Sequence, residues 1–186
     1  MVLKLNKVEP IKDMEDVKRL LSILKIKNER DYILALFGFY SGLRISDILP
    51  LKVIDLKGKT HIRVIEEKRE YKRDVVIPKK VKKEVDKYIE DKDPNEFIFK
   101  SRQGYNRPIS STQAYRILNN AAEEAGIKVN IGTHSLRKSF AYHLYKKTDI
   151  VYVQNVLGHS DISTTKRYLG IDLDEINLAI SKLGFI

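Results

Sequence analysis

The sequence contains no cysteine. This absence excludes disulfide bonds and thiolate metal sites, and it is compatible with a reducing interior. Long apolar runs are absent as well. Charge interrupts the first stretch, MVLKLNKVEPIKDMEDV, too early for the apolar core of a signal peptide, and no stretch approaches membrane-spanning length. We therefore expect a cytoplasmic protein without a membrane partner.

Phosphate-binding and metal-binding motifs are missing too. The chain has no GxxxxGK phosphate loop, and no carboxylates cluster at the spacing that would hold a catalytic magnesium ion. Metal-dependent nuclease chemistry is therefore disfavoured. We expect no cofactor, no metal and no small-molecule substrate.

Acidic residues are outnumbered: 25 Asp and Glu face 35 Lys and Arg, which gives a formal net charge of +10. The basic residues occur along most of the chain, so the folded surface should be basic and its partner anionic. Charge alone leaves nucleic acid, an acidic membrane and plain solubility open as explanations of the basic surface.

The length of the chain limits the number of domains. With 186 residues, 42% of them hydrophobic, the chain is long enough for one hydrophobic core and short for two. We expect one compact domain over residues 1–186.

The spacing of apolar residues predicts a mainly helical chain. Residues 13–24 are predicted to form a helix, because their apolar side chains fall on one stripe and Asp13 is available as the cap. Residues 28–40 include the run YILALFGFY, which predicts a central, buried helix that stops at Ser41-Gly42. Further helices are predicted at residues 81–90, 112–125, 134–146, 151–157 and 173–183.

One small sheet is also predicted. Residues 60–78 contain two β-branched runs around a charged middle, which indicates a hairpin with a long polar tip. The run FIFK at residues 97–100 is a candidate third strand, and the following GYNRP is a turn. The predicted fold class is mainly α with a small antiparallel β-sheet, an α+β fold.

Two short stretches place arginines where they can bind an anion. In SGLRISDIL, Arg44 follows a glycine turn after the most apolar helix, and Asp47 lies one helical turn later as a local partner that orients it. The ordinary interpretation of Arg44 is a helix-end charge, and the alternative is a phosphate ligand. In THSLRKSFAYHL, His134 and Arg137 are three residues apart and so share one helical face. The pair is either the solvated start of a helix or part of a functional site.

A third stretch, LGHSDISTTKRYL, carries His159 and Tyr168. Gly158 allows a sharp turn before His159, and SDISTT offers caps for a short helix that ends near Tyr168. A single tyrosine on a helix is more often a core residue than a nucleophile. Lys68, at the tip of the hairpin, is by default a solvated lysine.

The stretches GLRISDIL, HSLRKSFA and LGHSDISTTKRYL together resemble the signature boxes of the tyrosine recombinase (phage integrase) family, which includes lambda-type integrases, Xer-type recombinases and Cre. The resemblance runs from about residue 10 to 180, and the last box is the most specific. It implies the catalytic-domain fold of that family. It also implies the catalytic set Arg44, Lys68, His134, Arg137, His159 and Tyr168, with Lys72, Arg69 and Arg73 as alternatives to Lys68.

The resemblance implies a site-specific recombinase that cleaves and rejoins DNA through a 3′-phosphotyrosine on Tyr168. Planar guanidinium groups suit the charge on two non-bridging phosphate oxygens, so Arg44 and Arg137 would form the clamp. His134 would accept the phenol proton, Lys68 would protonate the leaving oxygen, and His159 would donate to a phosphate oxygen. Alternatives are a type IB topoisomerase, a telomere resolvase and a non-catalytic basic DNA-binding module.

Double-stranded DNA is the implied partner, with self-association into a tetrameric synapse in the full-length protein. We expect the family's N-terminal core-binding domain to be absent from this chain, so DNA binding should be weak and salt-sensitive. The terminal helix at residues 173–183 packs either on its own core or on a neighbouring subunit. Candidates for base contacts are Arg102, Asn106, Arg107, Gln113 and Arg116.

Overall fold

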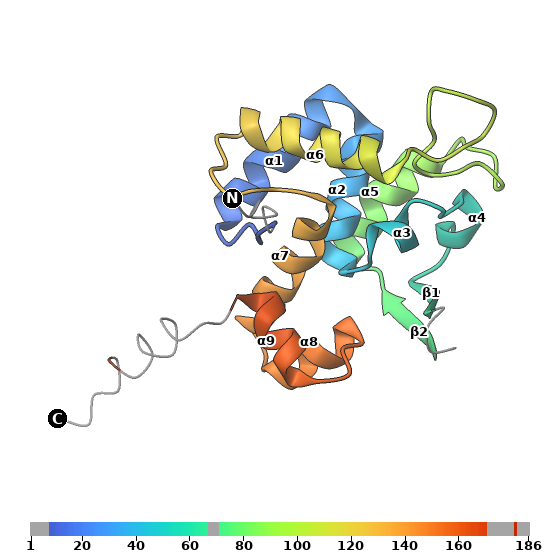
Figure 1. Cartoon of the computed structure of the whole chain (residues 1–186). Helices are drawn as coiled ribbons and strands as arrows, with labels where there is room; N and C mark the ends of the chain where they lie inside the picture. The colour runs from blue at the N-terminus through green and yellow to red at the C-terminus, as the bar shows by residue number, and fades with distance from the viewer. Residues whose placement is uncertain (1–7, 67–70, 171–180, 182–186) are drawn as a thin grey trace, which may run out of the picture. The chain divides into compact units, whose positions relative to one another are not determined.

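The computed structural model describes residues 8–66, 71–170 and 181, and this part of the chain is mainly helical with one two-stranded antiparallel sheet (Figure 1). The fold class predicted from the sequence is confirmed. The chain forms two compact units, Met1–Phe140 and Ala141–Ile186. The single domain expected over residues 1–186 stays a prediction. The first unit contains α1 (Met14–Lys27), α2 (Glu29–Ser41), α3 (Ile45–Ile48), α4 (Val53–Leu56), β1 (His61–Glu66), β2 (Tyr71–Val76), α5 (Lys79–Ile89), α6 (Ser111–Glu124) and the start of α7 (Thr133–Tyr145).

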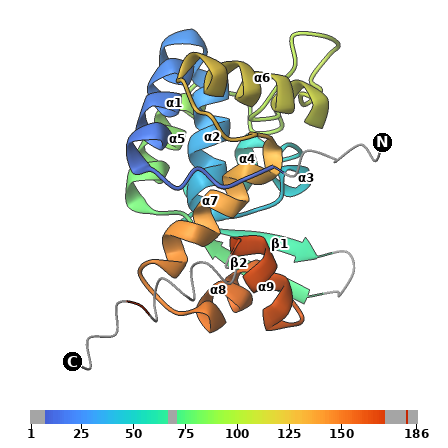
Figure 2. The ribbon, with the colours of Figure 1, turned by 60° about the vertical axis from the view of Figure 1, so that its left-hand side comes forward.

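Helix α2 is the centre of the first unit, as its sequence predicts. Its residues are buried from Asp31 to Phe39, and Ile33, Leu34 and Phe37 have almost no exposed surface. Helices α1, α5 and α6 pack against it (Figure 2). Each of them has buried apolar residues at helical spacing. Fully burying one such large apolar side chain contributes about 1.5 to 3 kcal/mol, so this helix anchors the core.

Polar side chains fix where these helices begin. The Asp13 carboxylate accepts a hydrogen bond from the backbone N–H of Glu15, so Asp13 caps α1 as predicted. Asn28 ends α1 and caps α2, since its side-chain oxygen accepts a hydrogen bond from the N–H of Asp31. Helix α2 stops at Gly42, whose φ is 62°, again at the predicted position.

The hairpin forms as predicted, and the third strand does not. Strands β1 and β2 pair antiparallel from His61 opposite Val76 to Glu66 opposite Tyr71. The tip between them, including Lys68, lies outside the described residues. The FIFK segment makes only isolated bridges, from Phe97 to Lys52 and from Lys100 to Pro108. Its backbone groups bond to other loops, with the N–H of Ile98 donating to the carbonyl of Leu51, so the segment does not extend the sheet.

The second unit contains α8 (Ile150–Leu157) and α9 (Ile162–Leu169), which pack on each other. Asp149 caps α8 and Asp161 caps α9 through backbone N–H groups. Hydrogen bonds from Ser163 and Thr164 also hold the pKa of Asp161 far below its usual range. The short helix predicted to end near Tyr168 is confirmed by α9, whereas most of the predicted helix at residues 173–183 and its docking lie outside the described residues.

Candidate active site

Arg44 is placed by the turn that ends α2. The left-handed conformation of Gly42 redirects the chain, and Arg44 then stands at the N-terminal end of the short helix α3. Asp47 orients Arg44 through the backbone, because its carboxylate accepts a hydrogen bond from the N–H of Arg44 at 3.2 Å. The side chain of Arg44 is half-buried. The predicted partnership of Asp47 with Arg44 therefore includes a contact to the main chain.

Arg137 reaches the same turn from α7. Its side chain is almost completely buried, at 3% exposure, and its Nη1 donates a hydrogen bond to the carbonyl oxygen of Gly42 at 2.5 Å. Gly42 lies two positions before Arg44, so the turn that presents one predicted arginine also holds the other. The structure thus brings Arg44 and Arg137 into one region, although they are far apart in the sequence.

Two glycines allow this approach. A Cβ atom at Gly38 would lie 2.6 Å from the Cδ1 of Leu136, and one at Gly42 would lie 2.3 Å from the Cδ1 of Phe140. Gly38 and Gly42 are one helical turn apart and so present one face of α2 to Leu136 and Phe140 of α7. We call these four residues the α2–α7 seam. The seam sets how close the backbone bearing Arg44 comes to the helix bearing Arg137.

Substitution Gly42→Ala is expected to lower the free energy of unfolding by about 2 to 4 kcal/mol. The left-handed backbone costs about 1 kcal/mol for a residue with a Cβ, and overlap with Phe140 adds an overpacking cost of roughly 1 to 3 kcal/mol. Gly58→Ala is the matched control, because Gly58 also has a positive φ, 74°, but nothing lies within 4 Å of its added Cβ. Urea unfolding of both variants measures the difference, and equal losses would contradict the packing role of Gly42.

His134 stands at the start of α7, close to both arginines. Partial removal of water from the imidazole lowers its pKa, and the positive charges of Arg137, Lys138 and Arg44 lower it further. The ring is therefore neutral at physiological pH and able to accept a proton. The electrostatic influence of both arginines on this ring places Arg44, His134 and Arg137 in one cationic cluster in the first unit.

Mild acid is expected to destabilise the fold through His134. The unfolded chain titrates near the ordinary pKa of 6.5, and the folded chain titrates below it. Just below pH 6.5 the unfolded state therefore binds more protons, so this contribution to stability is fully present above that pH and decreases as the pH falls. The thermal unfolding midpoint of the wild type should fall further between neutral and mildly acidic pH than that of His134→Asn. Equal decreases would show that His134 does not carry the effect.

Residues near the N-terminus hold the first half of α7 in place. Ser139 accepts a hydrogen bond from the backbone N–H of Ile11 at 2.7 Å, and the Nζ of Lys138 donates to the carbonyl of Val8 at 2.8 Å. Both side chains are buried. Sequence reasoning did not single out Lys138, although it directly follows Arg137, because nothing local indicates that its ammonium group is bound to a residue so distant in the chain.

In the second unit the structure brings His159 and Tyr168 together. Helix α8 ends at Gly158 in the left-handed conformation, as the sequence suggests, and His159 follows directly. The rings of His159 and Tyr168 meet edge to face, with centroids 5.3 Å apart and planes at 76°. The Nδ1 of His159 lies 3.0 Å from the hydroxyl oxygen of Thr165, which is fully buried. Thr165 is a further residue of this site that the sequence analysis missed.

The predicted catalytic residues that lie within the described ranges fall into two groups. Arg44, His134 and Arg137 gather in the first unit, and His159 and Tyr168 in the second. Lys68 lies outside the described residues. Within the described ranges, no three His, Cys, Asp or Glu side chains lie together so as to hold a metal ion. In that same part of the chain, no helix is both long and apolar enough to cross a membrane.

Comparison with known proteins gives concordant similarities. The model of the phage integrase family matches residues 12–174. The chain is 46% identical over 178 residues to the probable integrase/recombinase YoeC of Bacillus subtilis, covering 95% of this chain and 97% of that protein. It is 32% identical over 176 residues to the tyrosine recombinase XerA of Thermococcus kodakarensis, covering 92% of this chain but only 62% of that protein.

A solved structure shares the fold. The crystal structure of a XerA recombinase superposes with a TM-score of 0.75 at 22% identity, over 98% of this chain and 66% of that one. The chain thus spans nearly all of YoeC but about two thirds or less of the XerA proteins.

Proposed function

The chain belongs to the phage integrase family, the tyrosine recombinases, and from that membership we propose that it cleaves and rejoins DNA strands through a 3′-phosphotyrosine on Tyr168. One observation supports this most strongly. Arg137 is buried against the turn that carries Arg44, beside His134, whose pKa is lowered by burial and further by the positive charges of Arg137, Lys138 and Arg44. Burying a guanidinium group costs free energy because it loses its hydration, and its planar set of donors suits the binding of a phosphate.

The proposed reaction begins when the hydroxyl oxygen of Tyr168 attacks the scissile phosphorus. A free phenol has a pKa near 10, so attack at neutral pH needs a base, and neutral His134 accepts the proton. Arg44 and Arg137 bind the two non-bridging oxygens, whose negative charge grows in the transition state. His159 donates a further hydrogen bond to a phosphate oxygen.

The step forms a bond between Tyr168 and phosphorus and breaks the bond to the 5′ oxygen. That oxygen takes up a proton, for which Lys68 is the proposed donor, and leaves as a 5′ hydroxyl. The phosphotyrosine conserves the phosphodiester bond energy, so a 5′ hydroxyl of another strand reverses the step without ATP. Double-stranded DNA is the proposed substrate, and a tetramer assembled on DNA is the proposed form for strand exchange.

The test uses a pool of nicked duplexes with a randomised core, labelled at either end of the cleaved strand. The wild type should give an SDS-resistant protein–DNA band that carries the 5′ label, because the protein retains the 3′ phosphate. A band with the other label, or no band at any core sequence, would contradict the proposal. Exchange of strands between two differently labelled duplexes then separates recombination from the topoisomerase alternative, which rejoins only the original strand.

A further inference from the structure

A polar hollow of about 630 Å³ lies in the first unit, between the start of α2 and the loop of residues 101–107. Three arginines line it, Arg30, Arg102 and Arg107, and Asp31 is the carboxylate among its lining residues. Arg30 already neutralises that carboxylate, with an Nη2 to Oδ1 distance of 2.7 Å. The side chains of Arg102 and Arg107 are exposed. The hollow therefore has the charge to receive an anion.

The loop of residues 101–107 keeps a defined conformation although it buries little surface. The N–H of Ser101 donates to the carbonyl of Arg107 at 2.7 Å and closes the loop at its base. Asn106 adopts a positive φ of 41°, and its side chain accepts a bond from the N–H of Phe97 and donates to the carbonyl of Asn95. At the tip, Tyr105 is 96% exposed. These bonds hold a polar, arginine-bearing loop open to solvent.

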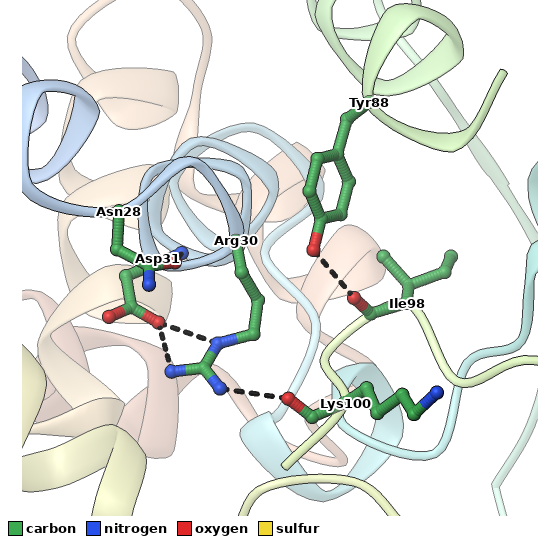
Figure 3. A network of polar contacts seen from close by, with 6 residues as sticks. All are labelled: Asn28, Arg30, Asp31, Tyr88, Ile98 and Lys100. Carbon is green, nitrogen blue, oxygen red and sulfur yellow. Dashed lines mark hydrogen bonds and ion pairs between the residues drawn. The ribbon is translucent and has the colours of Figure 1, made fainter. Parts of the chain in front are cut away.

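Arg30, on α2, holds the segment that leads into this loop (Figure 3). Its Nε donates to Asp31 at 2.8 Å, and its Nη1 donates to the carbonyl oxygen of Lys100 at 2.8 Å, just before the loop begins. The hydroxyl of Tyr88 holds the same segment by donating to the carbonyl of Ile98 at 3.2 Å. The Arg30 side chain is only 15% exposed. One guanidinium thus links an acidic residue of the central helix to the base of the loop.

Stability alone does not account for the contacts of Arg30 with Asp31 and the carbonyl of Lys100. An apolar residue of similar volume often serves a buried position as well as an ion pair does, because ions lose their hydration on burial. A guanidinium fork differs in that it fixes the geometry of two partners at once. The feature that Arg30 fixes here is the position of the segment leading into Arg102 and Arg107.

We propose that the loop of residues 101–107 and the adjoining hollow bind the DNA backbone outside the cleavage site, with Arg102 and Arg107 as phosphate ligands and Arg30 as their positioning residue. The identity of the partner rests on the proposed function. Guanidinium groups bind phosphate through paired hydrogen bonds, and two neighbouring arginines on a fixed loop present such pairs to a phosphodiester backbone. Arg30 acts through the Lys100 carbonyl and does not itself touch DNA.

The first experiment measures DNA binding to a mixed-sequence duplex between about 50 and 200 mM salt. Each lost phosphate contact reduces the slope of log affinity against log salt by about 1, so the double variant Arg102→Ala/Arg107→Ala should reduce it by about 2. The matched control is Lys79→Ala/Lys80→Ala, which removes the same charge from exposed positions at the start of α5 outside the hollow. Its slope should remain that of the wild type.

Equal slope changes in both double variants would mean diffuse attraction and would overturn the proposal, as would no change in the arginine variant. Formation of the covalent band is measured separately, so that a loss of DNA binding and a loss of the reaction can be told apart. The Lys79→Ala/Lys80→Ala control should form that band at the wild-type rate. If the wild type forms no band while the slopes differ as expected, the proposed reaction fails and the DNA surface stands.

The second experiment tests Arg30 as a positioning residue. Arg30→Lys keeps the charge, but one ammonium group cannot reproduce the fork between Asp31 and the Lys100 carbonyl. It should weaken DNA binding in the wild-type background and cause no further loss in the Arg102→Ala/Arg107→Ala background, because the ligands it positions are gone. Faster hydrogen exchange at the N–H of Ser101 should accompany the loss. Additive losses in the two backgrounds would contradict the positioning role.

Discussion

Tyr168→Phe is expected to abolish the covalent protein–DNA band and leave DNA binding at the wild-type level. The substitution removes only the attacking oxygen, and loss of a catalytic nucleophile lowers rates by on the order of 10⁴-fold or more. The phenylalanine ring keeps its edge-to-face contact with His159, so α9 should fold normally. Gel analysis of the nicked-duplex reaction measures the band, and a mobility shift under native conditions measures binding.

Tyr152→Phe is the matched control for this experiment. Tyr152 lies on α8 in the same unit, with 62% of its surface exposed, and its hydroxyl has no proposed part in the reaction. The control should form the covalent band at the wild-type rate. A band that persists in Tyr168→Phe would assign the nucleophile to another residue, with Tyr142 and Tyr152 as the first candidates.

Arg137→Lys is expected to slow formation of the covalent band by about 100-fold to 1,000-fold, which corresponds to roughly 2.7 to 4 kcal/mol of transition-state stabilisation. The lysine keeps the charge and loses the planar fork, which holds the carbonyl of Gly42 and is proposed to bond a phosphate oxygen. The rate should be measured at saturating DNA, so that weaker binding does not contribute to the effect. A similar loss is expected for Arg44→Lys.

Arg19→Lys provides the control for changing an arginine to a lysine. Arg19 is exposed on α1 and pairs there with Asp16, so its substitution should leave the covalent step unchanged. Thermal unfolding of Arg137→Lys distinguishes a catalytic defect from a folding defect. A variant that unfolds at the wild-type temperature and reacts within a few-fold of the wild-type rate would refute the proposed clamp.

Local sequence patterns predicted much of the fold because they depend on near neighbours. The apolar run in α2, the Asp13 cap and the glycine stop at Gly42 each follow from residues within one or two helical turns. The wrong prediction, a third strand at residues 97–100, shows the limit of such patterns. A short apolar run indicates burial, and Ile98 and Phe99 are indeed buried, but burial does not identify the hydrogen-bond partner.

The candidate site was predicted residue by residue, whereas its supports were not. The resemblance between short motifs supplied Arg44, His134, Arg137, His159 and Tyr168. Nothing in those motifs indicates that Lys138 bonds Val8, or that Arg30 bonds the carbonyl of Lys100. Such contacts join residues about 70 to 130 positions apart, and they depend on packing that no local pattern encodes. The choice of Lys68 as the general acid stays a prediction.

The α2–α7 seam has a consequence for protein engineering. The approach of the backbone bearing Arg44 to the helix bearing Arg137 depends on Gly38 and Gly42, where an added Cβ would overlap the side chains of Leu136 and Phe140. Libraries aimed at new target sequences should therefore leave positions 38, 42, 136 and 140 unchanged. Most substitutions at those four positions are expected to give inactive clones, which a selection for activity then removes.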